Sequence, residues 1–368
     1  MNDGRGVRVA VCCKGSVRIG LGHVTRARAV AESLAALGAE VMIHASGDDC
    51  LTPLLGAGAV PWRRVGSDHE LVTSVRTHGA DVTVCDMLDL DSDAFTALER
   101  VAPVCSLSPV FTGNPRARAV FHRSRVIPPE VLEADPEAGA RWRADRRYAV
   151  IRAECQRIGT QRFTRSVAPG RPLHVAISMG GGDADNRTLE VIRSLREVRT
   201  PTVFWVLLGE GYAHSYAQLV EAVSAQPEHE IILARTRRAM WRVLAQCGLA
   251  ILASGTTTYE AAYAGLPGVN LVESARARCM VEELCALGAC LALEGELEES
   301  LRALPELLSA LNTDRSALVR MHEAGRAALD KRGADRIARE IITIARGRTL
   351  PAVVRTPINI QAAIGGPA

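Results

Sequence analysis

The residues with the most recognisable chemistry in this chain follow an apolar run, Leu249–Ala253. The run predicts a short buried strand, then a small-residue turn, then a helix that ends near Gly265 and Pro267. The free N–H groups and the dipole at such a helix start attract anions. The residues of this segment that we expect to bind a phosphate-bearing ligand are Ser254, Gly255, Thr256, Thr257, Thr258 and Glu260.

Glu260 has a separate expected role in that set. It lies one helical turn beyond the threonines, where a carboxylate can bind the paired hydroxyls of a ribose while the phosphate lies on the turn. The alternative is that the threonines only cap the helix and that Glu260 is a solvated helix residue.

A second set of candidates follows the first apolar run of the chain. His23 and Arg26 are three positions apart in the first turn of an expected helix, so they share a face. A histidine there can act as a general base, and an arginine beside it can hold phosphate or carboxylate. Gly20 and Gly22 let a substrate approach the backbone closely. The alternative is a capping histidine and a surface arginine.

Further candidates follow other expected strands. Asp86 ends the run Asp81–Asp86, where a parallel strand delivers residues to a binding edge, although it could merely cap the next turn. One glycine-rich turn opens the second half of the chain, and Asp183 or Asp185 beside it is expected to cap a helix because a carboxylate there repels phosphate. The remaining candidate anion-binding residues are Gly180, Gly181, Gly182, Asn186, Arg276 and Arg278.

The elements that must position these residues alternate between strand and helix, which indicates an α/β protein with parallel sheets. Neither the GxGxxG fingerprint nor the GxxxxGK[ST] loop is present, which argues against NAD binding and ATP hydrolysis. Gln161–Pro172 is polar and holds two prolines, so we expect a linker there. The expected strands are Val7–Cys13, Glu40–Ala45, Asp81–Asp86, Ala102–Ser106, Leu173–Ser178, Val203–Leu208, Glu230–Ala234, Leu249–Ala253 and Gly268–Val272.

The composition excludes several classes of protein. A length of 368 residues suffices for two domains, and 48% hydrophobic with 23% charged residues is ordinary for a globular chain. A net charge of +3 and 4% aromatic residues argue against a nucleic-acid partner. The ten cysteines include no CxxC pair, so we expect buried reduced thiols, no metal site and no cofactor. Without a signal core or a membrane-spanning run, we expect a cytoplasmic protein.

Four motifs, taken together, resemble a known group of proteins. Gly20–Arg26 is similar to the GxGHxxR signature of the pseudaminic-acid pathway nucleotide-sugar hydrolases and the related SpsG-like proteins of spore-coat polysaccharide synthesis. Tyr148–Glu154 resembles their YALLRxEF segment, Ser178–Asn186 their SLGGxDPxN loop, and Ser254–Pro267 their GGSTxYE…GxP segment. The last two loops also resemble the donor half of the peptidoglycan glycosyltransferase that makes lipid II.

The resemblance implies a GT-B architecture, in which two Rossmann-like domains face a cleft. It assigns the diphosphate to the glycine and threonine turns, the ribose to Glu260, and the role of base toward water or an acceptor to His23. The implied organisation begins with an N-terminal acceptor and base domain (1–160), a linker (161–172) and a C-terminal donor domain (173–315). Helices that pack back toward the N-terminal domain (316–346) and a loose tail (347–368) follow.

Two departures from the family pattern bear on the reaction. The family has paired aspartates after the strand that here ends near Ser108, and an Asn-Gln after the strand that here ends at Glu273–Ala277. Because these positions are where the sugar and its acceptor lie in that fold, we expect metal-independent transfer of a sugar from a nucleoside-diphosphate sugar to a small acceptor, within carbohydrate biosynthesis. The alternatives are hydrolysis of the same donor and a non-catalytic nucleotide-sugar sensor. The nucleotide base and the oligomeric state cannot be read from the sequence.

Overall fold

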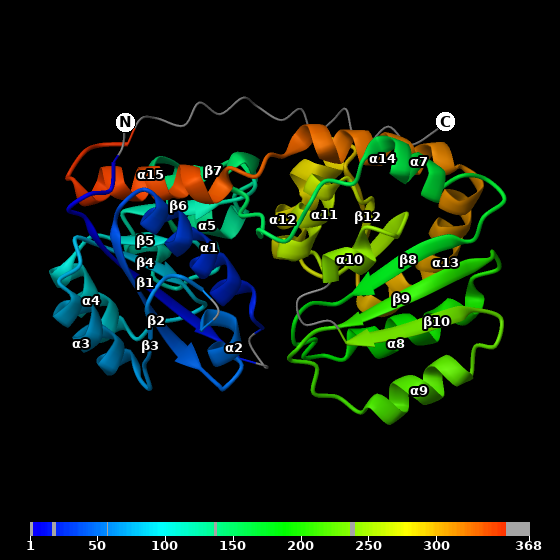
Figure 1. The fold of residues 1–368 in the computed structure, drawn as a ribbon, viewed down its shortest axis with the longest axis horizontal. Helices are drawn as coiled ribbons and strands as arrows, with labels where there is room; N and C mark the ends of the chain where they lie inside the picture. The colour runs from blue at the N-terminus through cyan, green and yellow to red at the C-terminus, as the bar shows by residue number, and fades with distance from the viewer. Residues whose placement is uncertain (1–2, 17–19, 57, 136–137, 236–239, 351–368) are drawn as a thin grey trace. The chain divides into compact units, whose positions relative to one another are not determined.

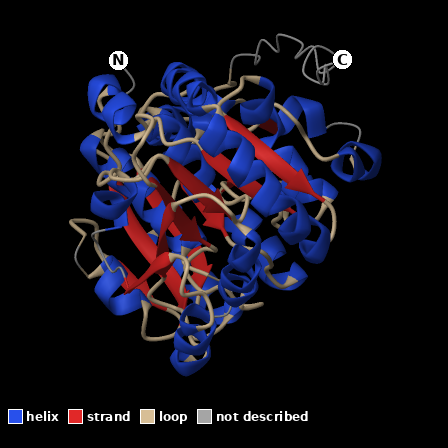
Figure 2. Cartoon of the chain, turned by 90° about the vertical axis from the view of Figure 1, so that its right-hand side faces the viewer, coloured by secondary structure: helices blue, strands red, loops and turns tan. Residues whose placement is uncertain are grey.

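The computed structural model describes residues 3–16, 20–56, 58–135, 138–235 and 240–350. The chain forms two compact units, and each is described by itself (Figure 1). Unit 1 comprises Met1–Ala153 and Lys331–Val354, and unit 2 is built on Glu154–Asp330. Strands lie in the interior and helices cover them (Figure 2).

The sheet of unit 1 is parallel throughout. In the described residues it has seven strands in the order β3-β2-β1-β4-β5-β6-β7. Because the chain adds strands outward in both directions from β1 and β4, the carboxyl ends of these two strands form the topological switch point, where α/β sheets bind ligands. The strands are β1 (Arg8–Gly15), β2 (Glu40–Gly47), β3 (Trp62–Arg64), β4 (Val82–Asp86), β5 (Val104–Ser106), β6 (Ala119–His122) and β7 (Trp142–Ala144).

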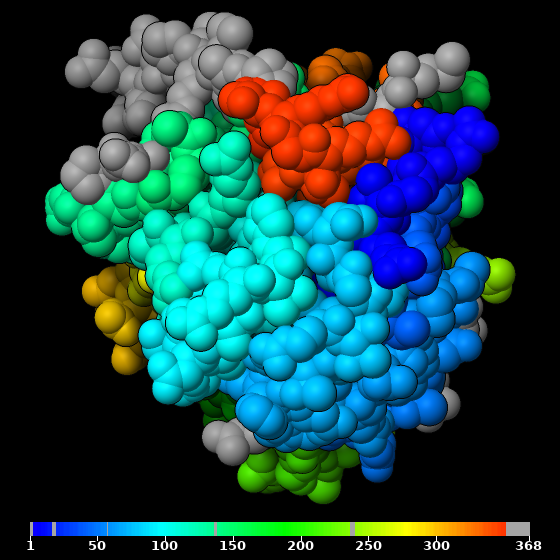
Figure 3. Space-filling model, turned by 90° about the vertical axis from the view of Figure 1, so that its left-hand side faces the viewer, coloured from blue at the N-terminus to red at the C-terminus, as the bar shows by residue number. Residues whose placement is uncertain are grey.

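Helices cover this sheet, and the last one returns from the far end of the chain. Helix α1 (Gly22–Ala36) buries Val24, Ala27 and Leu34 on one stripe and ends before Gly38, whose φ of +90° suits glycine. Helix α15 (Gly333–Ala345) packs against α1 through Ile337, Ile341 and Ile342. Figure 3 shows its red surface beside the dark blue N-terminal segment. The other helices of unit 1 are α2 (Leu51–Leu55), α3 (Asp68–His78), α4 (Ser92–Val101), η1 (Asn114–Arg116), α5 (Pro129–Ala134), α6 (Ala138–Arg141) and η2 (Arg146–Tyr148).

Unit 2 repeats the same design with six parallel strands among its described residues, in the order β10-β9-β8-β11-β12-β13. Its switch point lies between β8 and β11. The strands are β8 (Leu173–Ser178), β9 (Thr202–Leu208), β10 (Glu230–Arg235), β11 (Leu249–Leu252), β12 (Gly268–Val272) and β13 (Cys290–Glu294). The helices are α7 (Thr160–Ser166), α8 (Arg187–Ser194), η3 (Leu195–Glu197), α9 (Tyr216–Ser224), α10 (Met240–Leu244), α11 (Thr256–Ala264), α12 (Ala275–Ala286), α13 (Leu297–Thr313) and α14 (Arg315–Ala328).

The expected class, two parallel α/β domains, is confirmed, and all nine expected strands are present within a few residues. Four short strands were not expected: β3, β6, β7 and β13. The expected linker at 161–172 differs from the structure, because α7 occupies its first half and packs with α14 inside unit 2.

The C-terminal helices also differ from the expected organisation. Of the segment 316–346, only α15 packs in unit 1, whereas α14 contacts α11 in unit 2, where Gly325 allows close approach to Ala262. The part of the expected loose tail from residue 351 onward lies outside the described residues. In the part of the chain that the structure describes, no helix combines the length and the apolar character needed to span a bilayer.

Candidate functional site

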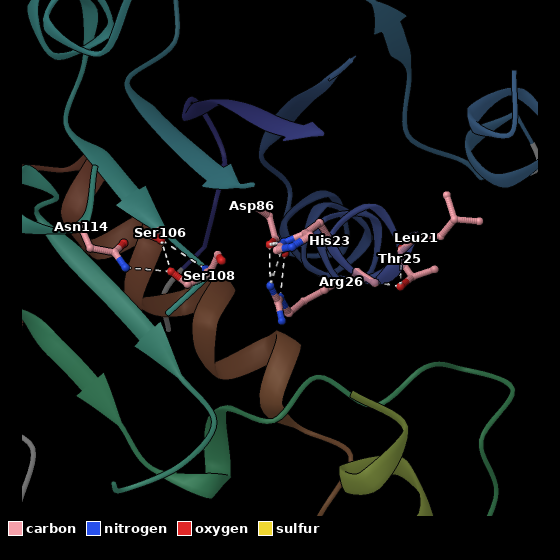
Figure 4. A network of polar contacts seen from close by, with 9 residues as sticks. Leu21, His23, Thr25, Arg26, Asp86, Ser106, Ser108 and Asn114 are labelled. Carbon is pink, nitrogen blue, oxygen red and sulfur yellow. Dashed lines mark hydrogen bonds and ion pairs between the residues drawn. The ribbon is translucent and has the colours of Figure 1, made fainter. Parts of the chain in front are cut away.

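A buried carboxylate at the switch point of unit 1 holds both predicted basic residues. Asp86 is the last residue of β4, and His23 and Arg26 come from the first turns of α1, directly after β1. Nδ1 of His23 lies 2.7 Å from Oδ1 of Asp86, while Arg26 donates from Nε to Oδ2 at 2.7 Å and from Nη2 to Oδ1 at 2.5 Å. Figure 4 shows the three side chains converging. The alternatives of a capping histidine, a surface arginine and a turn-capping Asp86 are therefore wrong.

The electrostatics of this triad keep Asp86 charged. Burial by itself raises the pKa of Asp86, whose side chain has no exposed surface, but the Arg26 charge and the His23 hydrogen bond outweigh it and hold the pKa below its usual 3.8. An ionised Asp86 accepts the Nδ1 proton of His23, which leaves the Nε2 lone pair of this partly exposed ring free to accept another proton. The geometry suits a general base with an orienting carboxylate.

The sequence reasoning did not single out Lys14, which follows Cys13, the β1 residue that pairs with Asp86 in the sheet. Lys14 lies near the carboxyl end of β1 and pairs with Asp68 at 2.9 Å and Asp89 at 3.1 Å. Burial lowers its pKa, but the two carboxylates outweigh this and raise it, so the ammonium stays charged. In the sequence, the feature that could have drawn attention to Lys14 is its position directly before the glycine loop. Gly20, with a φ of +89°, and Gly22, the exposed first residue of α1, lie in that loop, as expected.

In unit 2, the turn after β11 leads into a helix start that no side chain caps. Gly255 is the N-cap of α11 and has no side-chain hydrogen bond, and Thr256 and Thr257 are half-buried. Ser254 has a φ of +50°, a strained value for this residue, and its hydroxyl donates to Leu271 O at 2.7 Å. Thr258 is buried and donates to Asn270 Oδ1 at 2.6 Å. The turn is thus fixed by its hydroxyls, and the helix start remains available to an anion.

The turn after β8 is built differently from the expectation. Gly180–Gly182 is not a helix start, because α8 begins at Arg187 and its first turn is capped by the Asp183 carboxylate, which accepts from Arg187 N and Thr188 N, both at 2.9 Å. The expected aspartate cap is therefore Asp183. Gly180 is exposed, has a φ of +97° and has open space around it. Asn186, with a φ of +53°, accepts a hydrogen bond from the Tyr212 hydroxyl at 2.6 Å.

The two turns of unit 2 begin side by side. The last ladder pair between β11 and β8 joins Leu252 and Ser178, so both turns leave the same point of the sheet edge. Every positive φ outside glycine in the described residues belongs to these turns, at Asp183, Asn186 and Ser254. Such backbone strain gathers at functional sites.

Of the remaining predicted residues, Glu260 is buried, Arg278 is paired and Arg276 is exposed. Glu260 is completely buried, so the alternative of a solvated Glu260 is wrong, and a ribose has no access to it in this conformation. Arg278 forms an ion pair with Glu294 at the end of β13, and Arg276 is exposed on the first turn of α12. Within the described residues, no group of three or more His, Cys, Asp or Glu side chains is placed to hold a metal ion; metal independence stays a prediction.

At the level of sequence, no family model matches the chain. The curated protein "Uncharacterized protein MJ1062" of Methanocaldococcus jannaschii is 21% identical over 278 residues, 73% of this chain, and the chain spans about half (56%) of that relative's length.

Solved structures match over nearly the whole chain. MurG of Acinetobacter baumannii has a TM-score of 0.65 at 16% identity, and Anabaena HepE in complex with UDP-glucose has 0.63 at 13%; each match covers 91% of this chain and 99% of the other. A putative UDP-N-acetylglucosamine 2-epimerase of Listeria monocytogenes has 0.62 at 12%, covering 95% and 100%. With the two parallel sheets described above, these matches show that the chain adopts the GT-B fold.

Proposed function

We propose that this protein is a glycosyltransferase that moves a sugar from a nucleoside-diphosphate sugar to a hydroxyl or amine of a small acceptor, without a metal ion. The observation that carries the proposal is the hydrogen-bonded set His23, Asp86 and Arg26 at the switch point of unit 1. A histidine oriented by a buried carboxylate is an arrangement for moving protons.

In the proposed reaction, His23 Nε2 removes the proton from the acceptor as the acceptor atom bonds to the anomeric carbon. The bond from that carbon to the diphosphate oxygen breaks in the same step. Asp86 stabilises the imidazolium that forms, and Arg26 keeps Asp86 ionised. Because the imidazole of His23 is neutral before it takes the proton, the base itself does not repel the negatively charged donor.

Unit 2 is proposed to hold the nucleoside diphosphate. The N–H groups of Gly255, Thr256 and Thr257 at the uncapped start of α11 suit the diphosphate oxygens, which carry negative charge as the bond to the sugar breaks. Gly180 and Gly181 are exposed and Gly180 has open space around it, so a ligand can approach the backbone closely there. The exposed Arg276 adds positive charge on α12. Contact of Glu260 with the ribose requires movement of the residues that cover it.

The experiment is turnover of a panel of UDP-, dTDP-, GDP-, ADP- and CDP-sugars, with and without candidate acceptors. UDP-glucose is the first probe, because HepE was solved with it. Release of nucleoside diphosphate only when an acceptor is present supports transfer. Release of free sugar without any acceptor would instead assign the hydrolase. Tight binding without turnover of any donor would assign the sensor and remove the enzymatic proposal.

A further inference from the structure

We propose that Cys285 and Cys290 form a reversible disulfide under mild oxidation, and that this modification weakens nucleotide binding by unit 2. The second half of the proposal rests on the nucleotide site proposed above. The two thiols lie at the end of α12 and the start of β13; α12 contacts β12, and β13 pairs with β12 in the sheet.

The thiol pair is close and asymmetric. The two sulfurs are 3.4 Å apart, so they must approach by roughly 1.4 Å to reach a disulfide bond length. Cys285 is half-buried, which gives an oxidant access, whereas Cys290 is buried. Between them Gly288 has a φ of +70° and open space around it, so the connecting turn has room to adjust. Cys12 and Cys85 also lie close to each other, but both are completely buried, so an oxidant has no access to them.

The hydrogen bond between the two thiols favours Cys285 as the nucleophile. This bond lowers the pKa of Cys285 against the effect of its burial; the Arg278 charge adds to the lowering, and the Glu294 and Glu282 charges oppose it. The same hydrogen bond and its own burial raise the pKa of Cys290. A partly accessible thiol of lowered pKa with a second thiol in contact is the arrangement found in oxidation-sensitive pairs.

A chain of buried hydrogen bonds connects the pair to the helix start of the proposed nucleotide site. The side chain of Asn270, in the middle of β12, donates at 3.2 Å to the carbonyl oxygen of Leu291, the residue that follows Cys290 in β13. Its Oδ1 accepts the hydroxyl of Thr258, in the first turn of α11, at 2.6 Å. Asn270 and Thr258 are at most 1% exposed, so no solvent replaces a lost partner.

The reaction is written with hydrogen peroxide as the oxidant. The Cys285 thiolate attacks one peroxide oxygen, an S–O bond forms, the O–O bond breaks and hydroxide leaves, which gives a sulfenic acid. The Cys290 sulfur then attacks the Cys285 sulfur; the S–S bond forms, the S–O bond breaks, and the leaving hydroxide takes the Cys290 proton as water. Two thiols and one peroxide thus give one disulfide and two waters.

The expected consequence is a displaced Asn270. When Cys290 moves toward Cys285, the adjoining Leu291 carbonyl shifts away from the Asn270 amide, and Thr258 loses a well-placed acceptor. The first turn of α11 then loosens where the diphosphate is proposed to bind. Because the change weakens a single buried hydrogen bond, we expect the affinity for the nucleotide to fall about three- to tenfold.

The test uses the full chain, reduced or treated with hydrogen peroxide. Peptide mapping by mass spectrometry is expected to show a Cys285–Cys290 cross-link that dithiothreitol removes. Calorimetry with UDP, dTDP, GDP, ADP and CDP, each separately, is expected to show the fall in affinity and its recovery on reduction. Cys285→Ser is expected to abolish both effects, and Cys50→Ser, which alters another half-buried thiol, is expected to leave both intact.

Four further outcomes have defined meanings. Absence of the cross-link, under peroxide that oxidises Cys50, overturns the proposal. A cross-link with unchanged affinity overturns the connection to α11, as does a Thr258→Val variant that still responds to oxidation. If the reduced protein binds none of the five nucleotides, the proposed function fails, and the cross-link by mass alone still decides the disulfide.

Discussion

At the scale of single residues, Asp86 determines what His23 and Arg26 can do. A carboxylate without solvent exposure is stable in the fold only when its charge is compensated, and Arg26 compensates it through two hydrogen bonds. The same carboxylate fixes which nitrogen of His23 carries the proton. One buried side chain therefore connects the stability of unit 1 with the proposed proton transfer.

This dependence predicts how stability changes with pH. Because the pKa of Asp86 is lowered in the fold, its contribution to the free energy of unfolding is complete above an unfolded-state value near 3.8 and is lost as pH falls through the folded value. We expect Asp86→Asn to cost about 3 kcal/mol at roughly pH 6, and markedly less at roughly pH 3. Urea unfolding of both proteins at each pH measures this. An equal cost at both values would show that the charge of Asp86 is not what stabilises the fold.

At the scale of elements, the helix that follows β8 and the helix that follows β11 begin in opposite ways. Helix α8 is capped by the protein's own carboxylate, Asp183, whereas α11 has no side-chain cap. An internal anion at one helix start and none at its neighbour leaves α11 as the anion-receptive one. His214 also fixes Asp183, because its Nε2 donates to the Asp183 carbonyl oxygen at 2.7 Å.

Two neighbouring aspartates provide a matched test of this capping. Asp183→Ala is expected to lower the free energy of unfolding by about 1–2 kcal/mol, because it removes two hydrogen bonds to the first turn of α8. Asp185→Ala is expected to change it by less than about 0.5 kcal/mol, because Asp185 is largely exposed and makes only a surface ion pair with Arg187. Urea unfolding compares them. Equal effects would contradict the assignment of Asp183 as the cap.

At the scale of the whole molecule, the chain returns to unit 1 after completing unit 2. Helix α15 shares a core with β1, β2 and α1, and Arg143 and Tyr148 both bond its Glu340. Gly333 permits this docking, because a Cβ there would meet the Ala149 carbonyl oxygen. Unit 1 is therefore incomplete without residues that follow unit 2 in the chain.

Truncating one buried side chain of α15 tests that dependence. Ile341→Ala is expected to cost about 2–5 kcal/mol of unfolding free energy, because Ile341 is fully buried in the unit 1 core. The exposed Arg339→Ala on the same helix serves as the control, with an expected cost under about 0.5 kcal/mol. Tryptophan fluorescence during urea unfolding reports the result. A loss no larger than that of the control would show that α15 is not part of that core.

The sequence predicted long apolar strands, and residues that share one face of a helix, better than contacts between residues far apart in the chain. The five-residue β4 and six-residue β8 are recognisable runs, whereas the three-residue β3 and β7 are too short for a period to show. The shared face of His23 and Arg26 follows from helical spacing, but their bonding to Asp86 depends on β1 and β4 being neighbours. The burial of Glu260 depends on what covers α11, which no local pattern contains.

The most direct test of the central claim is turnover of the preferred nucleotide sugar by His23→Ala, with nucleoside-diphosphate affinity measured on the same sample. The account predicts that turnover falls about 100- to 10,000-fold, because a positioned base is lost, while affinity changes less than about twofold, because unit 2 is proposed to hold the nucleotide. Asp86→Asn is expected to lower turnover as well, through a misoriented imidazole. A His23→Ala protein that keeps full turnover would contradict the account.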